Sequence, residues 1–256
     1  MSGSDKVRLL LDHLERLGSV LVCYSGGVDS ALVLAAAHRA LNSRAIGMTA
    51  VSPSLAASEL DDARAIAAQI GADHRLVDSS EIDDPDYQAN GPDRCFHCKS
   101  ELYRIAARKQ IEWGLGHVVN GTNTDDLGDY RPGLEAATRA GVRSPLVELG
   151  FDKADVRACA QALGLEVWDK PAAACLSSRL PFGTRVTRER LTRIGGLEAS
   201  LRILGFKRVR VRYHPIGDAG ASPEQAIARI EVDASEIARA ASETVRDALV
   251  RAGRAA

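Results

Sequence analysis

The chain has 256 residues, of which 45% are hydrophobic and 26% are charged, and its formal net charge is −1. These values are typical of a soluble globular protein with one main domain and a smaller companion. The near-neutral charge gives no general attraction for nucleic acid or an anionic membrane, and no apolar run approaches the roughly 20 residues that span a bilayer. We therefore expect a cytoplasmic protein that binds neither nucleic acid nor a membrane. Its five cysteines are expected to be reduced, metal-bound or catalytic rather than paired in disulfides.

Helices and strands are predicted to alternate along the first part of the chain. Residues 1–17 are charged and predict an amphipathic helix rather than a leader sequence. The expected strands cover residues 19–24, 45–51, 74–77, 117–122 and 166–169, and the expected helices cover residues 31–41, 58–70, 99–114 and 152–164. Residues 78–94 are acidic, lack periodicity and predict a loop. The alternation predicts an α/β fold with a doubly wound parallel sheet, which binds ligands at the carboxyl ends of its strands.

The pattern changes near residue 180. A helix is predicted at residues 188–204, strictly alternating strands at 207–214 and 227–233, and a last helix at 235–252. We expect two domains, a larger one at residues 1–180 and a small α+β domain at residues 181–256.

The segment Ser25-Gly26-Gly27-Val28-Asp29-Ser30 lies between a predicted strand and a predicted helix. Its glycines lack a Cβ, so backbone N–H groups can approach a phosphate, and the helix adds its positive N-terminal end. The loop has no lysine and is not a Walker A motif. Asp29 instead fits a magnesium-bound β,γ-pyrophosphate, and Ser25 and Ser30 offer hydroxyl donors. We therefore expect this loop to bind ATP. Cleavage between the α and β phosphates would then activate a substrate oxygen as an adenylate.

Further residues are expected at the same edge of the sheet. The loops at Ser25, Ser52, Thr122 and Lys170 follow predicted strands and should converge there. Thr122 and Asp125 belong to the segment NGTNTDD, where a carboxylate could meet magnesium or the nucleotide. The alternative is that Asp125 and its neighbours only cap a helix.

Three cysteines occupy positions that suggest chemistry. Cys95 and Cys98 form a CxxC in a loop predicted to open a helix, and Cys175 follows the last predicted strand. These thiolates could hold three irons of a 4Fe–4S cluster and leave the fourth iron open to substrate. Zinc binding and a redox dithiol are the alternatives. Arg179 follows Cys175 in the same segment, and a nearby cation favours a thiolate. The remaining two cysteines are expected to be buried as small apolar residues: Cys23 and Cys159.

A strip of cationic side chains is predicted on one of the C-terminal strands. In KRVRVRYH the two-residue period places these on one face: Arg208, Arg210, Arg212 and His214. The residues between them face a core: Val209, Val211 and Tyr213. Such a strip suits the phosphate and carboxylates of a substrate, and the alternative is a solvated strand face.

Several motifs together resemble one family. SGGVDS, DRCFHCK at 93–99, NGTNTDD at 120–126, KPAAACLSSRLPFGT at 170–184, RVRYH and ARIEV are similar to the LarE-type ATP-dependent sulfur transferases, which build the nickel-pincer nucleotide cofactor of lactate racemase. The resemblance spans about residues 5–235. It implies that the first domain has the PP-loop ATP pyrophosphatase fold, which is related to that of the adenine nucleotide alpha hydrolases. It also implies that the second domain binds substrate or mediates oligomerisation, and that the protein is a homo-oligomer.

The resemblance implies a specific reaction. Each carboxylate of pyridinium-3,5-biscarboxylic acid mononucleotide is adenylated with ATP and Mg²⁺ and then converted to a thiocarboxylate. Residues implied to line the substrate or metal site are Arg179, Glu198, Arg210, Arg212, Arg229 and Glu231. In one subgroup Cys175 donates its own sulfur and becomes dehydroalanine, and in another a 4Fe–4S cluster on Cys95, Cys98 and Cys175 carries external sulfide. The three cysteines favour the cluster, and the sacrificial route remains open.

Other functions fit parts of the sequence. A tRNA thiolase also pairs a PP-loop with a CxxC and a distant cysteine, but the near-neutral charge and the lack of an RNA-binding module argue against it. A non-catalytic nucleotide-binding protein would not need Asp29 and Ser30, and an ammonia-using synthetase leaves the three cysteines unexplained. Residues 215–228 are longer than the turn expected between the two C-terminal strands and indicate an inserted loop.

Overall fold

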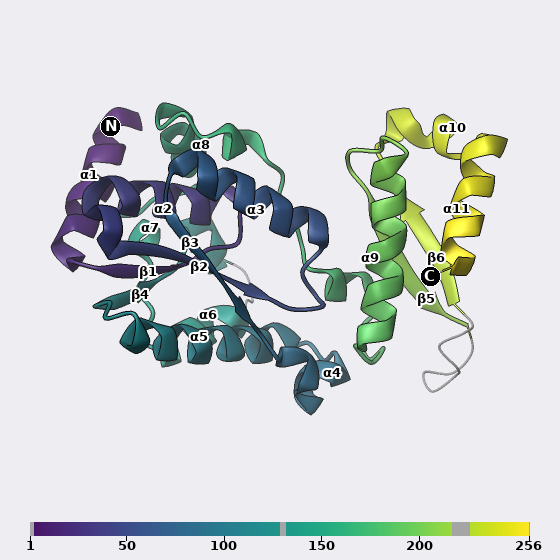
Figure 1. The fold of residues 1–256 in the computed structure, drawn as a ribbon, viewed down its shortest axis with the longest axis horizontal. Coiled ribbons are helices and arrows are strands. Elements are labelled where there is room, and N and C mark those ends of the chain that lie inside the picture. The colour runs from purple at the N-terminus through teal and green to yellow at the C-terminus, as the bar shows by residue number, and fades with distance from the viewer. Residues whose placement is uncertain (1–2, 129–131, 217–225, 256) are drawn as a thin grey trace. The chain divides into compact units, whose positions relative to one another are not determined.

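The computed structural model describes residues 3–128, 132–216 and 226–255 (Figure 1). The chain divides into two compact units. The first comprises Met1–Ser52, Glu59–Glu81 and Cys95–Ala173, and the second comprises Pro53–Ser58, Ile82–Arg94 and Ala174–Ala256. Within the described ranges, no helix is long and apolar enough to cross a membrane.

The first unit is built on a four-stranded parallel sheet in the order β3-β2-β1-β4. Its strands are β1 (Val20–Cys23), β2 (Ala45–Val51), β3 (Asp73–Asp78) and β4 (His117–Val119). The chain leaves β1 toward β2 and β3 and then returns to the other side of β1 with β4. The loop after β1 therefore lies where the strand order reverses, which is the ligand-binding position in sheets of this kind.

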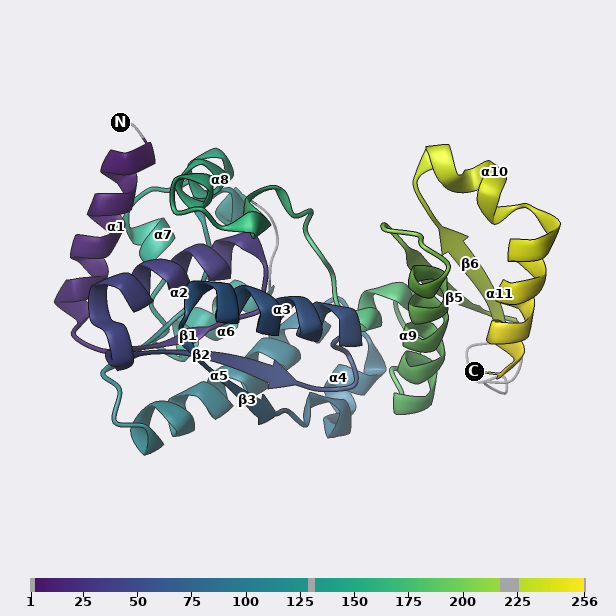
Figure 2. The same ribbon diagram turned by 45° about the horizontal axis from the view of Figure 1, so that its top comes forward.

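Helices cover both faces of this sheet (Figures 1 and 2). On one face lie α1 (Gly3–Leu17), α2 (Val28–Leu41), α3 (Ala57–Ile70) and α8 (Lys153–Ala162). On the other lie α5 (Arg94–Glu112) and α6 (Pro132–Arg139), and the short α7 (Pro145–Glu148) packs beside α1. This arrangement confirms the predicted doubly wound α/β fold.

The pleat of β1 explains the two cores of the first unit. Val20 and Val22 pack beneath α1, α2 and α8, whereas Leu21 faces the other way and packs with Met48 and Ile105 beneath α5. Helix α1 is amphipathic as predicted, and its apolar face is buried against α2 and α8 at Leu10, Leu14 and Leu17.

The second unit contains the predicted α+β elements. Its helices are α4 (Pro85–Ala89), α9 (Arg188–Ile203), α10 (Ile237–Ala240) and α11 (Glu243–Ala255), and its antiparallel strands are β5 (Arg210–Pro215) and β6 (Ala226–Glu231). Helix α9 packs on β5 and on α11. Val209, Val211 and Tyr213 are buried, which confirms the predicted core face of this strand.

Single 3-10 turns connect many of these elements. They lie at Asn42–Arg44, Glu81–Asp83, Thr124–Gly128, Glu166–Asp169, Leu176–Arg179 and Ala234–Glu236. The strand predicted at residues 166–169 is therefore wrong. The backbone groups beyond β4 are instead used by Arg143, whose N–H donates to Val118 and whose carbonyl accepts from Asn120.

Two further predictions about helices were wrong. Helix α5 begins at Arg94 rather than at residue 99, so the CxxC lies in its first turns and not in a preceding loop. The single C-terminal helix predicted at residues 235–252 is interrupted after Ala240 and continues as α11 from Glu243.

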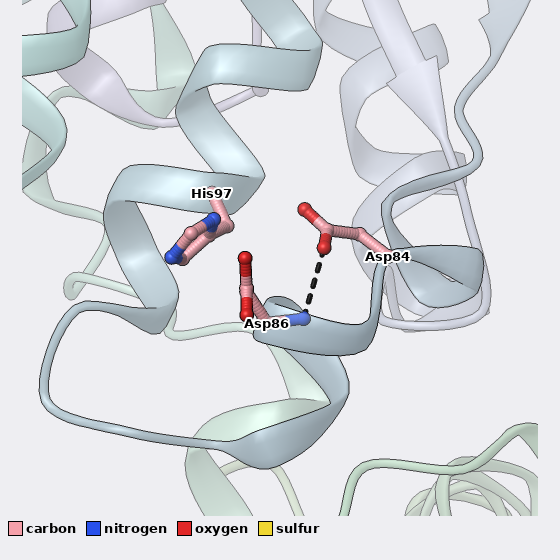
Figure 3. Close-up of side chains that lie close together, drawn as sticks. All are labelled: Asp84, Asp86 and His97. Atoms are coloured by element: carbon pink, nitrogen blue, oxygen red, sulfur yellow. Dashed lines mark hydrogen bonds between the residues drawn. The ribbon is translucent and has the colours of Figure 1, made fainter.

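The predicted loop at residues 78–94 also contains the short helix α4. The Asp84 carboxylate caps this helix by accepting the N–H of Asp86 at 2.9 Å, and Pro85 occupies its first position (Figure 3). Sequence periodicity cannot reveal a helix of one turn. Most of the expected inserted loop lies outside the described residues, at 217–225.

Candidate active site

The loop after β1 has the conformation that its glycines permit. Gly26 has a φ of +75°, and a Cβ there would lie 2.8 Å from the Cβ of Ala63, so the loop passes tightly against α3. The hydroxyl oxygens of Ser25 and Ser30 lie 3.1 Å apart, and Ser30 Oγ also accepts the N–H of Ser25 at 3.2 Å. Gly27 is the N-cap of α2 and provides no capping side chain. The positive end of α2 therefore lies at the loop, as phosphate binding requires.

Asp29 is the centre of a long-range polar cluster. Its Oδ1 accepts from Asn123 Nδ2 at 2.9 Å, and its Oδ2 accepts from Lys153 Nζ at 2.5 Å. Lys153 is the first residue of α8, and its backbone N–H donates to Asp125 Oδ2 at 3.1 Å. A lysine is thus present beside the phosphate loop, although the loop itself has none.

The loop after β4 lies against the phosphate loop. A Cβ on Gly121 would come within 2.6 Å of the Ser30 nitrogen, so only glycine fits at this crossing. Thr122 is fixed by its N–H bond to Asn120 Oδ1 at 3.0 Å. Asp125 is exposed and is oriented by the Lys153 backbone, so the structure brings the predicted Thr122 and Asp125 into the same loop cluster.

Lys170, near the end of the first unit, forms ion pairs with two carboxylates of α3. Its ammonium group donates to Glu59 Oε2 at 2.9 Å and to Asp62 Oδ2 at 2.7 Å. Ala63, which Gly26 touches, is the next residue of α3. The segment that leads toward Cys175 therefore leaves the first unit from an anchored residue next to the phosphate loop.

The five cysteines fall into two groups. Cys159 is buried as predicted, whereas Cys23, at the end of β1, is only half-buried. Desolvation raises the pKa of the Cys23 thiol to about 12 and that of Cys159 to about 11, so both stay protonated at neutral pH. In contrast, Cys95 and Cys175 are exposed and Cys98 is half-buried. Cys95 and Cys98 are three residues apart on α5 and therefore share one side of the helix. Cys175 belongs to the second unit.

The residues around Cys175 form a buried ion pair. Arg179 Nε donates to Glu198 Oε1 at 2.8 Å, and the two side chains are 8% and 4% exposed. Glu198 Oε1 also accepts the N–H of Val211 at 3.0 Å. The structure thus places these two predicted site residues in contact with each other and with β5.

A second buried network holds the loop that follows Cys175. Ser177 Oγ lies 2.6 Å from the hydroxyl of Tyr87, and the Ser177 carbonyl accepts from Arg94 Nη1 at 2.9 Å. Asn90 Nδ2 donates to the carbonyls of Pro181 and Thr184 at 2.8 and 2.9 Å. These partners lie in the segment predicted to be a loop, and nothing in its composition singled them out.

The cationic strip on β5 meets one carboxylate. Glu231 Oε1 accepts from Arg212 Nε at 2.6 Å and from Arg229 Nη2 at 2.7 Å, and Arg212 lies opposite Arg229 in the register. The Arg212 hydrogen bond, together with Arg229, holds the pKa of Glu231 below its usual range. Arg210 is exposed on the same strand and lies opposite Glu231. Several guanidinium groups around one carboxylate leave a net positive surface suited to an anionic ligand.

A parallel sheet with a lysine-free phosphate loop at its switch point defines a PP-loop enzyme that uses ATP. Family and relatives agree with this class. The asparagine synthase family model matches residues 8–90, which include the phosphate loop. An uncharacterized protein of Synechocystis is 46% identical over 91% of this chain and 83% of its own length. The pyridinium-3,5-bisthiocarboxylic acid mononucleotide synthase of Lactiplantibacillus plantarum is 38% identical over 82% of this chain and 76% of its own length.

The chain belongs to the LarE-type family of ATP-dependent sulfur transferases, which form AMP and pyrophosphate. More distant similarity reaches the tRNA-specific 2-thiouridylase of Rickettsia peacockii, which is 29% identical over 61% of this chain and 53% of its own length.

Proposed function

We propose that this enzyme converts the carboxylates of pyridinium-3,5-biscarboxylic acid mononucleotide to thiocarboxylates, a step in making a nickel-pincer nucleotide cofactor. The observation that carries the proposal is the combination of a PP-loop with an exposed cysteine, Cys175, at the head of a loop held by buried polar contacts. The likeness to the Lactiplantibacillus plantarum synthase, whose name states this product, supports the choice of substrate.

The first step is activation of the carboxylate. A substrate carboxylate oxygen attacks the α-phosphorus of ATP, and pyrophosphate leaves with the electrons of the broken P–O bond. The N-terminal end of α2 and the hydroxyls of Ser25 and Ser30 bind the polyphosphate. Asp29 and Asp125 offer the hard oxygen ligands that Mg²⁺ prefers, and the ion would neutralise charge on the departing pyrophosphate. Lys153 supplies a further positive charge at this position.

The second step is replacement of AMP by sulfur. A sulfur nucleophile attacks the acyl carbon, and AMP leaves with the electrons of the C–O bond. If Cys175 is the donor, a thioester forms first. Removal of the Cys175 Cα proton then breaks its Cβ–S bond and leaves a thiocarboxylate and dehydroalanine. This route consumes one protein molecule for each sulfur.

We favour the alternative in which Cys95, Cys98 and Cys175 hold a 4Fe–4S cluster. Cys95 and Cys98 share one side of α5. Cys95 and Cys175 are exposed and Cys98 is half-buried, whereas Cys159 is fully buried. The cluster would supply external sulfide to the acyl adenylate and spare Cys175. The chain's own role in this route is to present two exposed cysteines and one half-buried cysteine from two segments.

Substrate binding is assigned to the second unit. Arg210, Arg212 and Arg229 form the cationic face that would bind the phosphate or carboxylates of the nucleotide, and Glu231 orients Arg212 and Arg229. Arg179 and Glu198 support this site from the buried ion pair. We further propose a homo-oligomer in the cytoplasm with no nucleic-acid partner.

One anaerobic experiment tests the proposal. The purified protein is mixed with ATP, Mg²⁺, the dicarboxylate nucleotide and sulfide, and its iron content, visible spectrum and mass after turnover are measured. A brown, iron-containing protein of unchanged mass supports the cluster route, whereas a mass loss equal to H₂S supports sacrifice of Cys175. Absence of both AMP and thiocarboxylate refutes the proposed function, and a salt-sensitive complex with tRNA would favour the thiolase relatives instead.

A further inference from the structure

Arg179 restrains the backbone on both sides of Cys175. Its Nη1 donates to the carbonyl oxygen of Ala174 at 3.2 Å and to Ser178 Oγ at 2.9 Å. Ser178 Oγ in turn donates to the carbonyl oxygen of Cys175 at 2.7 Å. One guanidinium group therefore holds the carbonyl before the cysteine directly and the carbonyl of the cysteine itself through a single hydroxyl.

The guanidinium group is itself fixed by the core of the second unit. Glu198 Oε1 accepts from Arg179 Nε at 2.8 Å and from the N–H of Val211 at 3.0 Å, so the pair is tied to both α9 and β5. Arg179 and Glu198 are both buried, whereas Cys175 is exposed. The contacts of this arginine are thus made within the fold, and only the cysteine that it restrains reaches the surface.

The segment that precedes Cys175, residues 171–174, has few groups that could fix it in place. Residues 171–174 are exposed and carry only proline and alanine side chains, which can neither donate nor accept a hydrogen bond. On the far side of the cysteine, the N–H of Leu176 donates to the carbonyl of Ser54 at 2.8 Å. Among the described residues, Arg179 is therefore the side chain whose hydrogen bond restrains the N-terminal side of Cys175.

We propose that Arg179, held by Glu198 and acting through Ala174 and Ser178, is a positioning residue that fixes the place of the Cys175 sulfur. The proposal rests on the proposed function, in which this sulfur is either the donor or a cluster ligand. Sulfur transfer needs close approach to the acyl carbon, and a misplacement of about 1 Å can cost about 10²-fold in rate. Adenylation uses the phosphate loop and does not need the cysteine. Loss of the restraint therefore slows sulfur transfer selectively.

The test measures thiocarboxylate formed per AMP released. Ser178→Ala removes the bridging hydroxyl and leaves the buried ion pair intact, and we expect the ratio to fall about tenfold while AMP formation changes less than about twofold. AMP continues to appear because water hydrolyses the stalled acyl adenylate. Arg179→Lys keeps the charge opposite Glu198, but a point-like ammonium cannot reach all three acceptors, so we expect a fall of about 10²-fold. The matched controls are Ser200→Ala, whose hydroxyl donates to the Gly196 carbonyl within α9, and Arg202→Lys, whose half-buried guanidinium donates to the Lys207 carbonyl.

A second measurement needs no turnover. Amide hydrogen exchange in a peptide covering residues 172–180 is expected to be faster in Ser178→Ala and Arg179→Lys than in either control. If the wild type makes no thiocarboxylate but the exchange difference is present, the proposed function fails and the restraint remains demonstrated. An unchanged product ratio in both variants, or an equal fall in AMP and thiocarboxylate, overturns the positioning role. Unchanged exchange in both variants overturns it as well.

Discussion

The carboxylate of Asp29 is shared between a neutral donor, Asn123, and a cationic donor, Lys153. In the proposed mechanism, Mg²⁺ that arrives with ATP would compete for this carboxylate and would leave the Lys153 ammonium group free to contact the polyphosphate. We expect Lys153→Met to raise the KM for Mg-ATP about tenfold, because a charge-assisted contact worth about 1.4 kcal/mol is lost. AMP release measured against ATP concentration checks this. The exposed Lys207→Met is the control, and an unchanged or lower KM in Lys153→Met would show that this lysine only masks Asp29.

The sequence predicts the phosphate loop because the residues of the loop are contiguous and each has a physical role between a strand and a helix. It missed Lys153, which is separated from Asp29 by 124 positions and meets it only because α8 begins at the same sheet edge. Similarly, Arg179 and Glu198 were predicted as residues of the substrate or metal site, whereas their contact with each other depends on how α9 packs on β5. Local motifs predict local geometry, and pairings between distant segments need the fold.

The junction of α4 with the loop after Cys175 depends on one amide. Asn90 has a φ of +56°, is fully buried, and accepts from Arg94 Nη1 while donating to two carbonyls. Asn90→Gly keeps the permitted backbone conformation and removes the amide. We expect it to lower the free energy of unfolding by about 3 kcal/mol, since each unsatisfied buried group costs about 1–3 kcal/mol.

Urea denaturation measures this effect, and Asn42→Gly is the matched control. Asn42 also has a positive φ, of +50°, but it is exposed, so its change should stay within about 0.5 kcal/mol. Equal effects of the two substitutions would mean that backbone conformation, and not the buried hydrogen bonds, accounts for the loss.

The α7 region should give the first unit a measurable pH dependence. Glu148 accepts from Arg143 Nε at 3.0 Å and lies 2.9 Å from His13 Nε2 of α1. The Arg143 hydrogen bond holds the pKa of Glu148 below its usual value of 4.5. A lowered folded-state pKa stabilises the fold above pH 4.5, and this contribution disappears as the pH falls through the lower value. We expect Glu148→Gln to cost about 1 kcal/mol at pH 7 and progressively less as the pH falls below 4.5, as measured by denaturation across pH. A cost independent of pH would assign the effect to packing.

At the level of elements, the sequence predicted the parallel strands and long helices well, because burial imposes their periodicity. The predicted secondary structure was wrong where a short segment is compatible with more than one kind of local structure. Residues 166–169 form a 3-10 turn because Arg143 takes the neighbouring position beside β4. Helix α5 begins at Arg94, directly after the break at Gly91 and Pro92, and thereby places the CxxC on a helix. That change fixes Cys95 and Cys98 on one side of the helix, which a loop would not do.

At the level of the whole molecule, the residues proposed to bind ATP and those proposed to bind the substrate belong to different units. The phosphate loop, Asp125 and Lys153 belong to the first unit, and the arginines of β5 and β6 belong to the second. The second unit is assembled from three separate stretches of sequence, so the proposed boundary near residue 180 describes only where its longest stretch begins. The segments Pro53–Ser58 and Ile82–Arg94 join it through pairings such as Arg94 with Ser177, which no local pattern reveals.

This division predicts that binding of the two ligands can be impaired separately. Asp29→Asn keeps the size of the side chain but loses the charge needed for Mg²⁺, so the Kd for Mg-ATP should rise at least about tenfold while that for the dicarboxylate nucleotide changes less than about twofold. Arg212→Gln removes a guanidinium group from the anion-binding face and should do the reverse. Calorimetric titration of each variant with each ligand measures both constants in the absence of turnover. If either substitution weakens both ligands equally, the assignment of ATP to one unit and substrate to the other is wrong. If Arg212→Gln leaves nucleotide binding unchanged, the arginine strip is only a solvated strand face.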